Sequence, residues 1–172
     1  ILTQTDVILH IDYSDGLPAG EIDYRLLLFN GSKIKHTDAE GNSHIGQLFH
    51  GKPFAVEAPQ TGQHVDFWVD RERTVYSTVF DCYTSYRVEM KNQFGESKPE
   101  YTINIDGNPV VTDKDGVYMS DKVLLMPEMS VTVKYEEMET AYSLARDPKE
   151  NVFVIQVTDQ VAPPDNPDNP VV

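Results

Sequence analysis

The chain has 172 residues, of which 40% are hydrophobic and 24% charged, an ordinary globular composition that can bury a core without metals or disulfides. Its formal net charge of −14 repels phosphate backbones and argues against nucleic acid as a partner. No apolar run approaches the roughly 20 residues that cross a bilayer, so no transmembrane segment is expected. A single cysteine, Cys82, excludes an internal disulfide.

Short segments of alternating apolar and polar side chains follow one another along the chain, with turn-forming residues between them. Such alternation predicts strands that have one face in a core and the other in water. The segments are 7–13, 22–28, 33–37, 65–69, 75–80, 83–91, 98–105, 116–120, 122–126 and 129–136. The pattern is least regular between 38 and 64, where short apolar pieces lie at 45–49 and 54–56.

These segments predict an all-β protein, an antiparallel β-sandwich of the immunoglobulin-like or a related kind, because the helices that connect parallel strands are missing. A barrel is the alternative. At most one short helix is expected, near residues 137–146, where Met138, Ala141 and Tyr142 fall on one helical face.

A single folded unit is expected over residues 1–160, with a possible boundary near residue 106 at the turn Asp106-Gly107-Asn108-Pro109. Only about 55 residues remain after that turn, a length at which an independent core is marginal. Residues 161–172, rich in Pro, Asn and Asp, are expected to be a linker or tail.

Two resemblances add to this interpretation. The run Tyr86-x-Val88-x-Met90-x-Asn92-x-x-Gly95-x-Ser97 resembles the penultimate strand and following turn of fibronectin type III and related immunoglobulin-like domains. The whole chain, acidic, β-rich and nearly free of cysteine, also resembles the surface lipoproteins and fimbrillin-like pilus subunits of Bacteroidales. The second resemblance implies a secreted role in adhesion or assembly.

No catalytic, metal or cofactor site is predicted. Histidines 36, 44, 50 and 64 are spread over an irregular region and are expected to be surface side chains, since zinc ligands usually come in close pairs. The stretches Asp38-x-Glu40-x-Asn42 and Asp113-x-Asp115-Gly116 begin like calcium loops but lack the closing carboxylate. We expect each to be a turn in which the Asp side chain binds nearby backbone N–H groups.

Four residues are the candidates for binding. Trp68 and Tyr76 belong to a set of aromatic side chains that offer large contact area, although core packing explains such residues equally well. Trp68 lies out of phase with Phe67 and should therefore point away from the core. Val152 and Val154 lie in the dense apolar strand 151–158, which should be buried on both faces or paired at a sheet centre. A terminal strand of this kind could also be exchanged between subunits.

The function expected from these features is that of a non-catalytic secreted or cell-surface module for adhesion or assembly, such as a pilus or fimbrillin-like subunit or an accessory domain. The expected partner is a protein or glycan at a surface, with self-assembly by strand addition as one mode. The alternatives are a carbohydrate-binding or hydrolytic β protein that uses residues 38–83, and a virion surface module. The chain begins at Ile1, which suggests processing, for example of a secretion or lipoprotein signal with a lipid anchor, or a cloning boundary.

Overall fold

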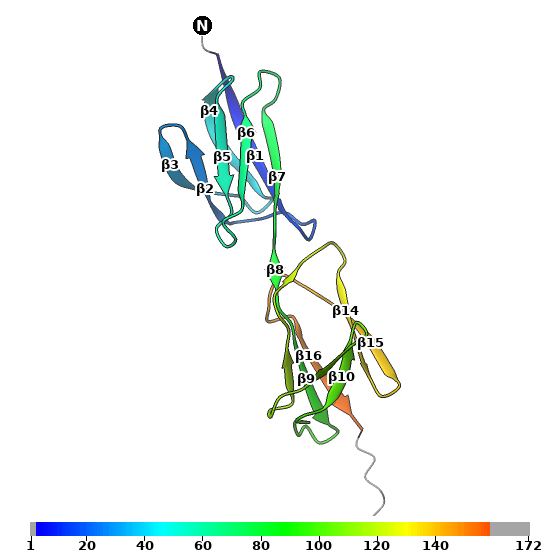
Figure 1. Ribbon diagram of the computed structural model, residues 1–172. Coiled ribbons are helices and arrows are strands. Elements are labelled where there is room, and N and C mark those ends of the chain that lie inside the picture. The colour runs from blue at the N-terminus through cyan, green and yellow to red at the C-terminus, as the bar shows by residue number, and fades with distance from the viewer. Residues whose placement is uncertain (1–2, 159–172) are drawn as a thin grey trace, which may run out of the picture. The chain divides into compact units, whose positions relative to one another are not determined.

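The computed structural model describes residues 3–158, and their contacts divide them into two compact units (Figure 1). Unit 1 consists of residues 3–83 together with Leu124–Met129, and unit 2 of residues 84–123 and 130–158. The sequence had favoured one unit over 1–160 with a possible boundary near 106, whereas the units divide at Tyr83 and Thr84. The predicted tail, 161–172, lies outside the described residues.

Unit 1 is a sandwich of a three-stranded sheet in the order β4-β1-β7 and a four-stranded sheet in the order β3-β2-β5-β6. The strands are β1 (Gln4–Tyr13), β2 (Asp23–Leu28), β3 (Gly31–His36), β4 (Asn42–Phe49), β5 (Pro53–Glu57), β6 (His64–Trp68) and β7 (Val75–Phe80). Alternate side chains of both sheets point inward and share one core, in which Leu9, Tyr76 and Phe54 are among the largest buried side chains.

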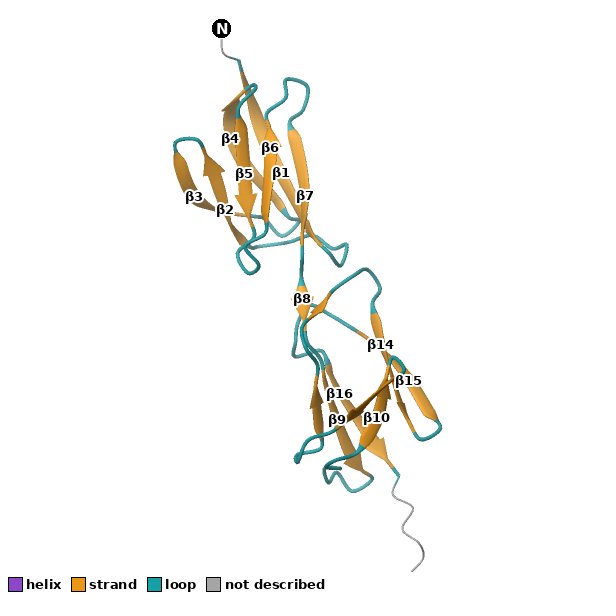
Figure 2. Ribbon diagram, in the orientation of Figure 1, coloured by secondary structure: helices purple, strands orange, loops and turns teal. Residues whose placement is uncertain are grey.

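Unit 2 has the same plan, with a three-stranded sheet β12-β9-β16 and a four-stranded sheet β11-β10-β14-β15 (Figure 2). The strands are β9 (Arg87–Asn92), β10 (Thr102–Ile105), β11 (Asn108–Val111), β12 (Val117–Met119), β14 (Ser130–Tyr135), β15 (Met138–Ser143) and β16 (Val152–Val157). Two short strands, β8 (Tyr83–Thr84) and β13 (Val123–Leu124), pair with each other. Val88, Met90 and Ile155 are buried in the core of this unit.

The prediction of an all-β sandwich is confirmed, and no helix occurs among residues 3–158. The sequence allowed at most one short helix near 137–146; this candidate does not form, because Met138–Ser143 is β15 and pairs with β14 along its whole length. Glu136, with φ of 52°, lies in the tight turn between the two strands. Most side chains of β15 are exposed, so their helical spacing does not reflect a buried face.

Not every strand pair is antiparallel. In each unit the first long strand pairs in parallel with the last, β1 with β7 and β9 with β16. The run from Tyr86 to Ser97 therefore lies at the start of unit 2. The fibronectin resemblance implies instead that this run precedes the last strand of its domain. Strand β16 lies at a sheet edge with alternate side chains exposed, which corrects the expectation of burial on both faces.

The two units repeat the same backbone hydrogen bonds. The N–H of Ile11 donates to the carbonyl of Gly41 in unit 1, and the N–H of Met90 donates to that of Gly116 in unit 2. The parallel pairs also match, since both β1 with β7 and β9 with β16 align over six residues. The units are therefore two versions of one module, and their residues can be matched one to one around these contacts.

A buried threonine holds the same turn in each module. Thr37 and Thr112 accept a hydrogen bond from the backbone N–H of Ile22 and Tyr101, at 3.0 and 2.8 Å respectively. Each hydroxyl also donates to a carbonyl, that of Ala19 at 2.7 Å or that of Lys98 at 2.8 Å. Both threonines are almost fully buried, so the bonds lie out of reach of water. The matched Glu21 and Glu100 both have a positive φ, of 56° and 54°.

Candidate interaction surface

Strands β2, β4 and β6 finish at the same end of unit 1 (Figure 1). Three exposed aromatic side chains lie at this end. Phe29 is 85% exposed, Trp68 66% and Phe49 37%. We call this surface the aromatic end of unit 1 and define it by Phe29, Phe49, Lys52, Pro53, Trp68 and Arg71. Clustered aromatic residues beside an arginine are typical of protein contact surfaces.

The alternation of the strands dictates which aromatics face outward. Phe54 and Phe67 point into the core and stack with ring centroids 4.9 Å apart, so their neighbours Pro53 and Trp68, which are paired across β5 and β6, point outward. The pairing of β2 with β5, continued by one step past Leu28, brings Phe29 opposite Pro53. The predicted exposure of Trp68 is thus confirmed, while its role as a contact stays a prediction.

Three neighbouring hollows lie at the aromatic end of unit 1. An apolar hollow of about 170 Å³ is lined by Phe29, Phe49 and Lys52 among others. It shares Val69 with an open hollow of about 460 Å³ beside Trp68 and Arg71. It also shares Leu28 and Asn30 with a hollow of about 180 Å³ that Lys33 lines. We refer to these three open hollows together as the depression of the aromatic end.

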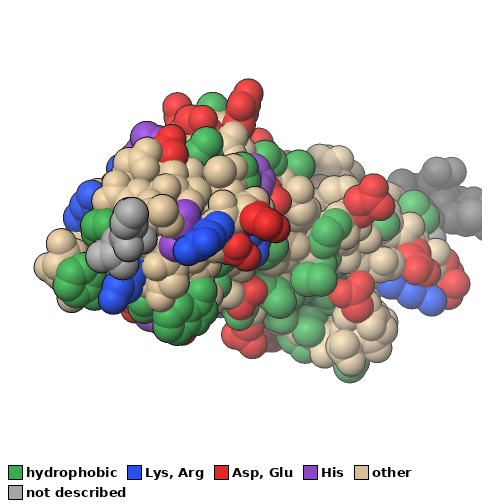
Figure 3. Space-filling model, turned by 90° about the horizontal axis from the view of Figure 1, so that it is seen from above, with side chains coloured by type: hydrophobic (Ala, Val, Ile, Leu, Met, Phe, Trp, Pro, Cys, Tyr) green, Lys and Arg blue, Asp and Glu red, His purple; other side chains and the backbone are tan. Residues whose placement is uncertain are grey.

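The charge of this depression is opposite to that of the chain. Lys33, Lys52 and Arg71 line it together with one carboxylate, that of Asp70, in a protein whose net charge is −14. A side-chain oxygen of Asp70 accepts a hydrogen bond from the backbone N–H of Glu72 at 3.1 Å. Hydrophobic side chains lie next to Lys and Arg side chains in the space-filling view (Figure 3). The surface therefore favours an acidic partner.

Hydrogen bonds fix the loops of the aromatic end. The N–H of Gly51 donates to the carbonyl of Val69 at 2.9 Å, and the N–H of Val69 donates to that of Lys52 at 3.0 Å. Opposite sides of the His50 ring contact the hydroxyl groups of Thr3 and Thr5. A surface held in this way loses little conformational entropy on binding.

Tyr76, predicted as a binding residue, lies in the core and supports the surface from below. Its hydroxyl accepts a hydrogen bond from the N–H of Asp70 at 2.7 Å, and the guanidinium of Arg73 lies 4.6 Å from its ring centroid. Tyr76 is therefore not available to a partner in this structure. Its contacts instead shape the loop that carries Arg71.

The predicted contact residues Val152 and Val154 lie on the outer side of β16 and are 38% and 50% exposed. Within the described chain, β16 pairs only with β9 and leaves its other edge unpaired. An edge with exposed valines is suited to strand addition. Strand exchange through Val152–Val157 stays a proposal.

The acidic and histidine side chains of unit 1 bind one another. His10, His36, His44 and His64 each lie within 3.0 Å of an Asp, and no group of three or more metal-binding side chains occurs among residues 3–158. Hydrogen bonding to Asp66 is the main factor that raises the pKa of the exposed His64. These contacts agree with the prediction of surface histidines.

The two calcium-like stretches are self-capping turns, as predicted. A carboxylate oxygen of Asp38 accepts the N–H groups of Glu40 and Asn42, both at 2.9 Å. Asp113 does the same for the N–H groups two and four residues further on, at 2.8 and 3.0 Å. Those carboxylate oxygens are thus committed to the backbone.

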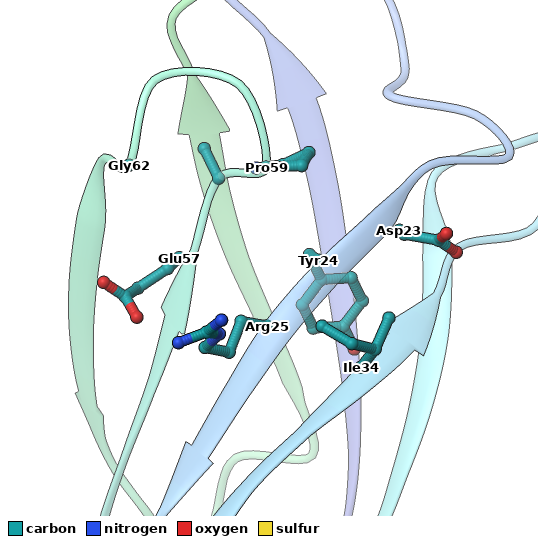
Figure 4. A pocket seen from close by; sticks show the side chains of 8 residues that line it. Asp23, Tyr24, Arg25, Ile34, Glu57, Pro59 and Gly62 are labelled. Carbon is teal, nitrogen blue, oxygen red and sulfur yellow. The ribbon is translucent and has the colours of Figure 1, made fainter.

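A fourth hollow, of about 360 Å³, lies beside β2, β3 and β5 (Figure 4). Arg25 and Glu57 are cross-strand partners there, and their side chains lie near each other in the figure. The carboxylate of Asp23 contacts His36 at 2.8 Å, and that of Glu57 lies 3.8 Å from His64. Both carboxylates of the hollow are thus close to a basic side chain.

No protein-family model and no curated protein matches the sequence. Among solved structures, the chain is similar to the TIE protein of Bacillus anthracis, with 15% identity and a TM-score of 0.42 over 91% of this chain and 33% of that one. It is also similar to a streptococcal ancillary pilin, with 10% identity and a TM-score of 0.36 over 91% and 62%.

A further similar structure is the major pilin subunit of Bacillus cereus, with 8% identity and a TM-score of 0.35 over 91% of this chain and 99% of that one. The chain thus spans one third of the TIE protein and less than two thirds of the streptococcal pilin. At these identities and TM-scores, the similarities do not assign the chain to a family.

Proposed function

We propose that this protein is a non-catalytic module of a secreted or cell-surface assembly, in the manner of a pilus or fimbrillin-like subunit, and that it acts by binding a protein or glycan at a surface. The observation that carries the proposal is the aromatic end of unit 1, where Trp68 and Phe29 are exposed beside Lys52 and Arg71. Large aromatic side chains in this setting contribute strongly to protein contacts.

The internal repeat supports a binding role for Trp68. The outermost pair of the β5–β6 hairpin is Pro53 with Trp68, and the matching outermost pair of the β14–β15 hairpin is Ser130 with Ser143. The module therefore folds with serine at this position in unit 2. An exposed tryptophan in unit 1 is not required by the fold, which favours a role in recognition.

An adhesion assay tests the proposal. Beads coated with the full chain are passed over immobilised collagen, fibronectin, mucin and the chain itself, and retention under flow is measured. We expect at least one surface to retain the beads, and we expect Trp68→Ser to reduce retention while Val79→Thr, at an exposed site on β7, does not. Equal retention of the wild type, Trp68→Ser and Val79→Thr would contradict the proposal. The absence of retention on every surface would also contradict it.

A further inference from the structure

The segment that follows β13 is packed into unit 1. Leu125 is 1% exposed, and its N–H donates to the carbonyl of Cys82 at 2.8 Å. Pro127 lies against the turn at Gly16, because a Cβ atom on that glycine would be 3.4 Å from the proline ring. Residues 124–129 therefore belong to unit 1, with Pro127 against the turn Ser14-Asp15-Gly16.

The internal repeat identifies which residues correspond to the segment 124–127 and to the turn at Gly16 in the other module. The N–H of His50 donates to the carbonyl of Thr3 as that of Leu125 does to Cys82, so Phe49–Lys52 in unit 1 matches 124–127. The turn at Gly95 matches the turn at Gly16, since the N–H of Gly95 donates to the carbonyl of Asn92 as that of Gly16 does to Tyr13. The matching turn and the matching segment thus lie at opposite ends of the module.

Among the described residues, no segment packs on the turn at Gly95 and no turn packs under Phe49–Lys52 as the turn at Gly16 and residues 124–127 pack on each other. A Cβ atom on Gly95 would meet no other atom within 4 Å, and the adjacent Phe94 is 73% exposed. Phe49 is also exposed, at the aromatic end of unit 1. A turn without its covering segment and a segment without its turn are both present in one chain, so a second copy could supply each to the other.

The charges of the two surfaces are complementary. The turn at Gly95 lies at the end of unit 2 where β9 and β16 finish, which we call the acidic end of unit 2. Its five carboxylates outnumber its three ammonium groups; they are those of Glu96, Glu100, Asp113, Asp115 and Glu136 against Lys91, Lys98 and Lys114. The aromatic end of unit 1 is lined by Lys33, Lys52 and Arg71 against Asp70.

We propose that the acidic end of unit 2 of one copy docks onto the aromatic end of unit 1 of a second copy, with Phe94 against the depression between Phe49 and Trp68. This inference rests on the proposed function and names the partner as the chain itself. Because the two surfaces differ, the contact is heterologous, and each copy keeps one surface available for the next. Association therefore continues beyond a dimer.

Sedimentation of the full chain over a range of concentrations tests this contact. We expect the average mass to rise past that of a dimer, and the emission of Trp68, the single tryptophan, to shift to shorter wavelength as it loses water. Trp68→Ser and Phe94→Ser should each weaken association by about tenfold or more, as for a central aromatic contact. Val79→Thr, at an exposed site on β7, is the matched control.

A mixture of the two serine variants separates this contact from a symmetric one. The Trp68→Ser chain keeps an intact acidic end and the Phe94→Ser chain an intact aromatic end, so the mixture should form dimers and stop there. A mixture that stays monomeric, or a wild-type chain that is monomeric throughout, would overturn the inference. Association unaffected by either substitution would also overturn it and direct attention to the edge of β16.

The adhesion assay distinguishes a failure of the self-association proposal from a failure of the proposed function. Retention on collagen, fibronectin or mucin without retention on the chain itself would reject self-association and leave the proposed function standing. The absence of retention on every surface would reject both.

Discussion

At the scale of residues, a few polar side chains make several hydrogen bonds each and hold segments that are distant in sequence. Asn151, which is fully buried, is the clearest case in unit 2. Its amide nitrogen donates to the hydroxyl of Thr84 and to the carbonyl of Ala145, both at 2.8 Å. Its oxygen accepts the N–H of Ala145 at 2.8 Å. The side chain thereby connects the start of the unit with the approach to β16.

Replacing this amide should be costly. Asn151→Ala leaves the N–H and the carbonyl of Ala145 without their partner, and buried unsatisfied groups of this kind cost about 1–3 kcal/mol each. We expect a loss of free energy of unfolding on the order of 3 kcal/mol in urea titrations. Asn108→Ala, at an exposed site in the same unit, is the control and should change little. A small effect of Asn151→Ala would show that water replaces the amide.

His10 lies between two acceptors. Its Nδ1 lies 2.8 Å from Oδ1 of Asn42 and its Nε2 lies 2.9 Å from Oδ1 of Asp12, so only the protonated ring can donate to both. Burial lowers the pKa of His10, but the bonds to Asn42 and Asp12 outweigh it and leave the pKa above its usual value.

The raised pKa of His10 makes its contribution to stability decrease as the pH rises. A histidine whose pKa is raised in the folded state contributes stability that is complete below its unfolded pKa, about 6.5, and is lost as the pH rises through the folded pKa. Urea titrations at pH 6 and pH 8 should show this loss in the wild type and a smaller loss in His10→Gln. Equal pH dependence in both proteins would contradict the assignment.

At the scale of elements, the turns explain both the successes and the errors of the sequence analysis. Alternation located most strands within a few residues, including β7 and β14. The sequence Asp106-Gly107 predicts a break, but its two positive φ angles make it the tight turn of a hairpin that leads into β11. The β14–β15 turn at Glu136-Glu137 lacks glycine, so nothing in the sequence announced it.

A glycine in one such turn should be sensitive to substitution. Gly116 has φ of 75°, and a Cβ atom there would lie 2.8 Å from the backbone nitrogen of Lys98 and 3.0 Å from the carbonyl oxygen of Met90. Gly51 has a similar φ of 73°, but a Cβ atom there would meet nothing within 4 Å. The two positions therefore share backbone strain and differ in steric conflict.

We expect Gly116→Ala to lower the free energy of unfolding more than Gly51→Ala, by at least about 1 kcal/mol, because the backbone atoms around Gly116 cannot move away without breaking the hydrogen bond between Lys98 and Met90. Thermal or urea unfolding of the two variants measures the difference. Equal losses would mean that the strained φ alone determines the effect.

At the scale of the whole molecule, the alternation of side chains predicts the all-β class, but it favours one unit where the contacts give two. The signal was present in the residues that resembled calcium loops, because Thr37-Asp38 with Gly41 and Thr112-Asp113 with Gly116 are the same turn in two modules. Comparing those turns as a repeat would have indicated the duplication. The aromatic end could be predicted only through Trp68, since Phe29 and Phe49 join it by strand pairing.

The parallel pairs β1–β7 and β9–β16 bear on how each module responds to tension. Within unit 1 the chain arrives at one end of β1 and departs from the opposite end of β7, and the same holds for β9 and β16 in unit 2. A force that stretches the chain therefore acts along these strands and must slide six aligned residues past one another together, instead of opening their hydrogen bonds one at a time. Each module is built to carry mechanical load.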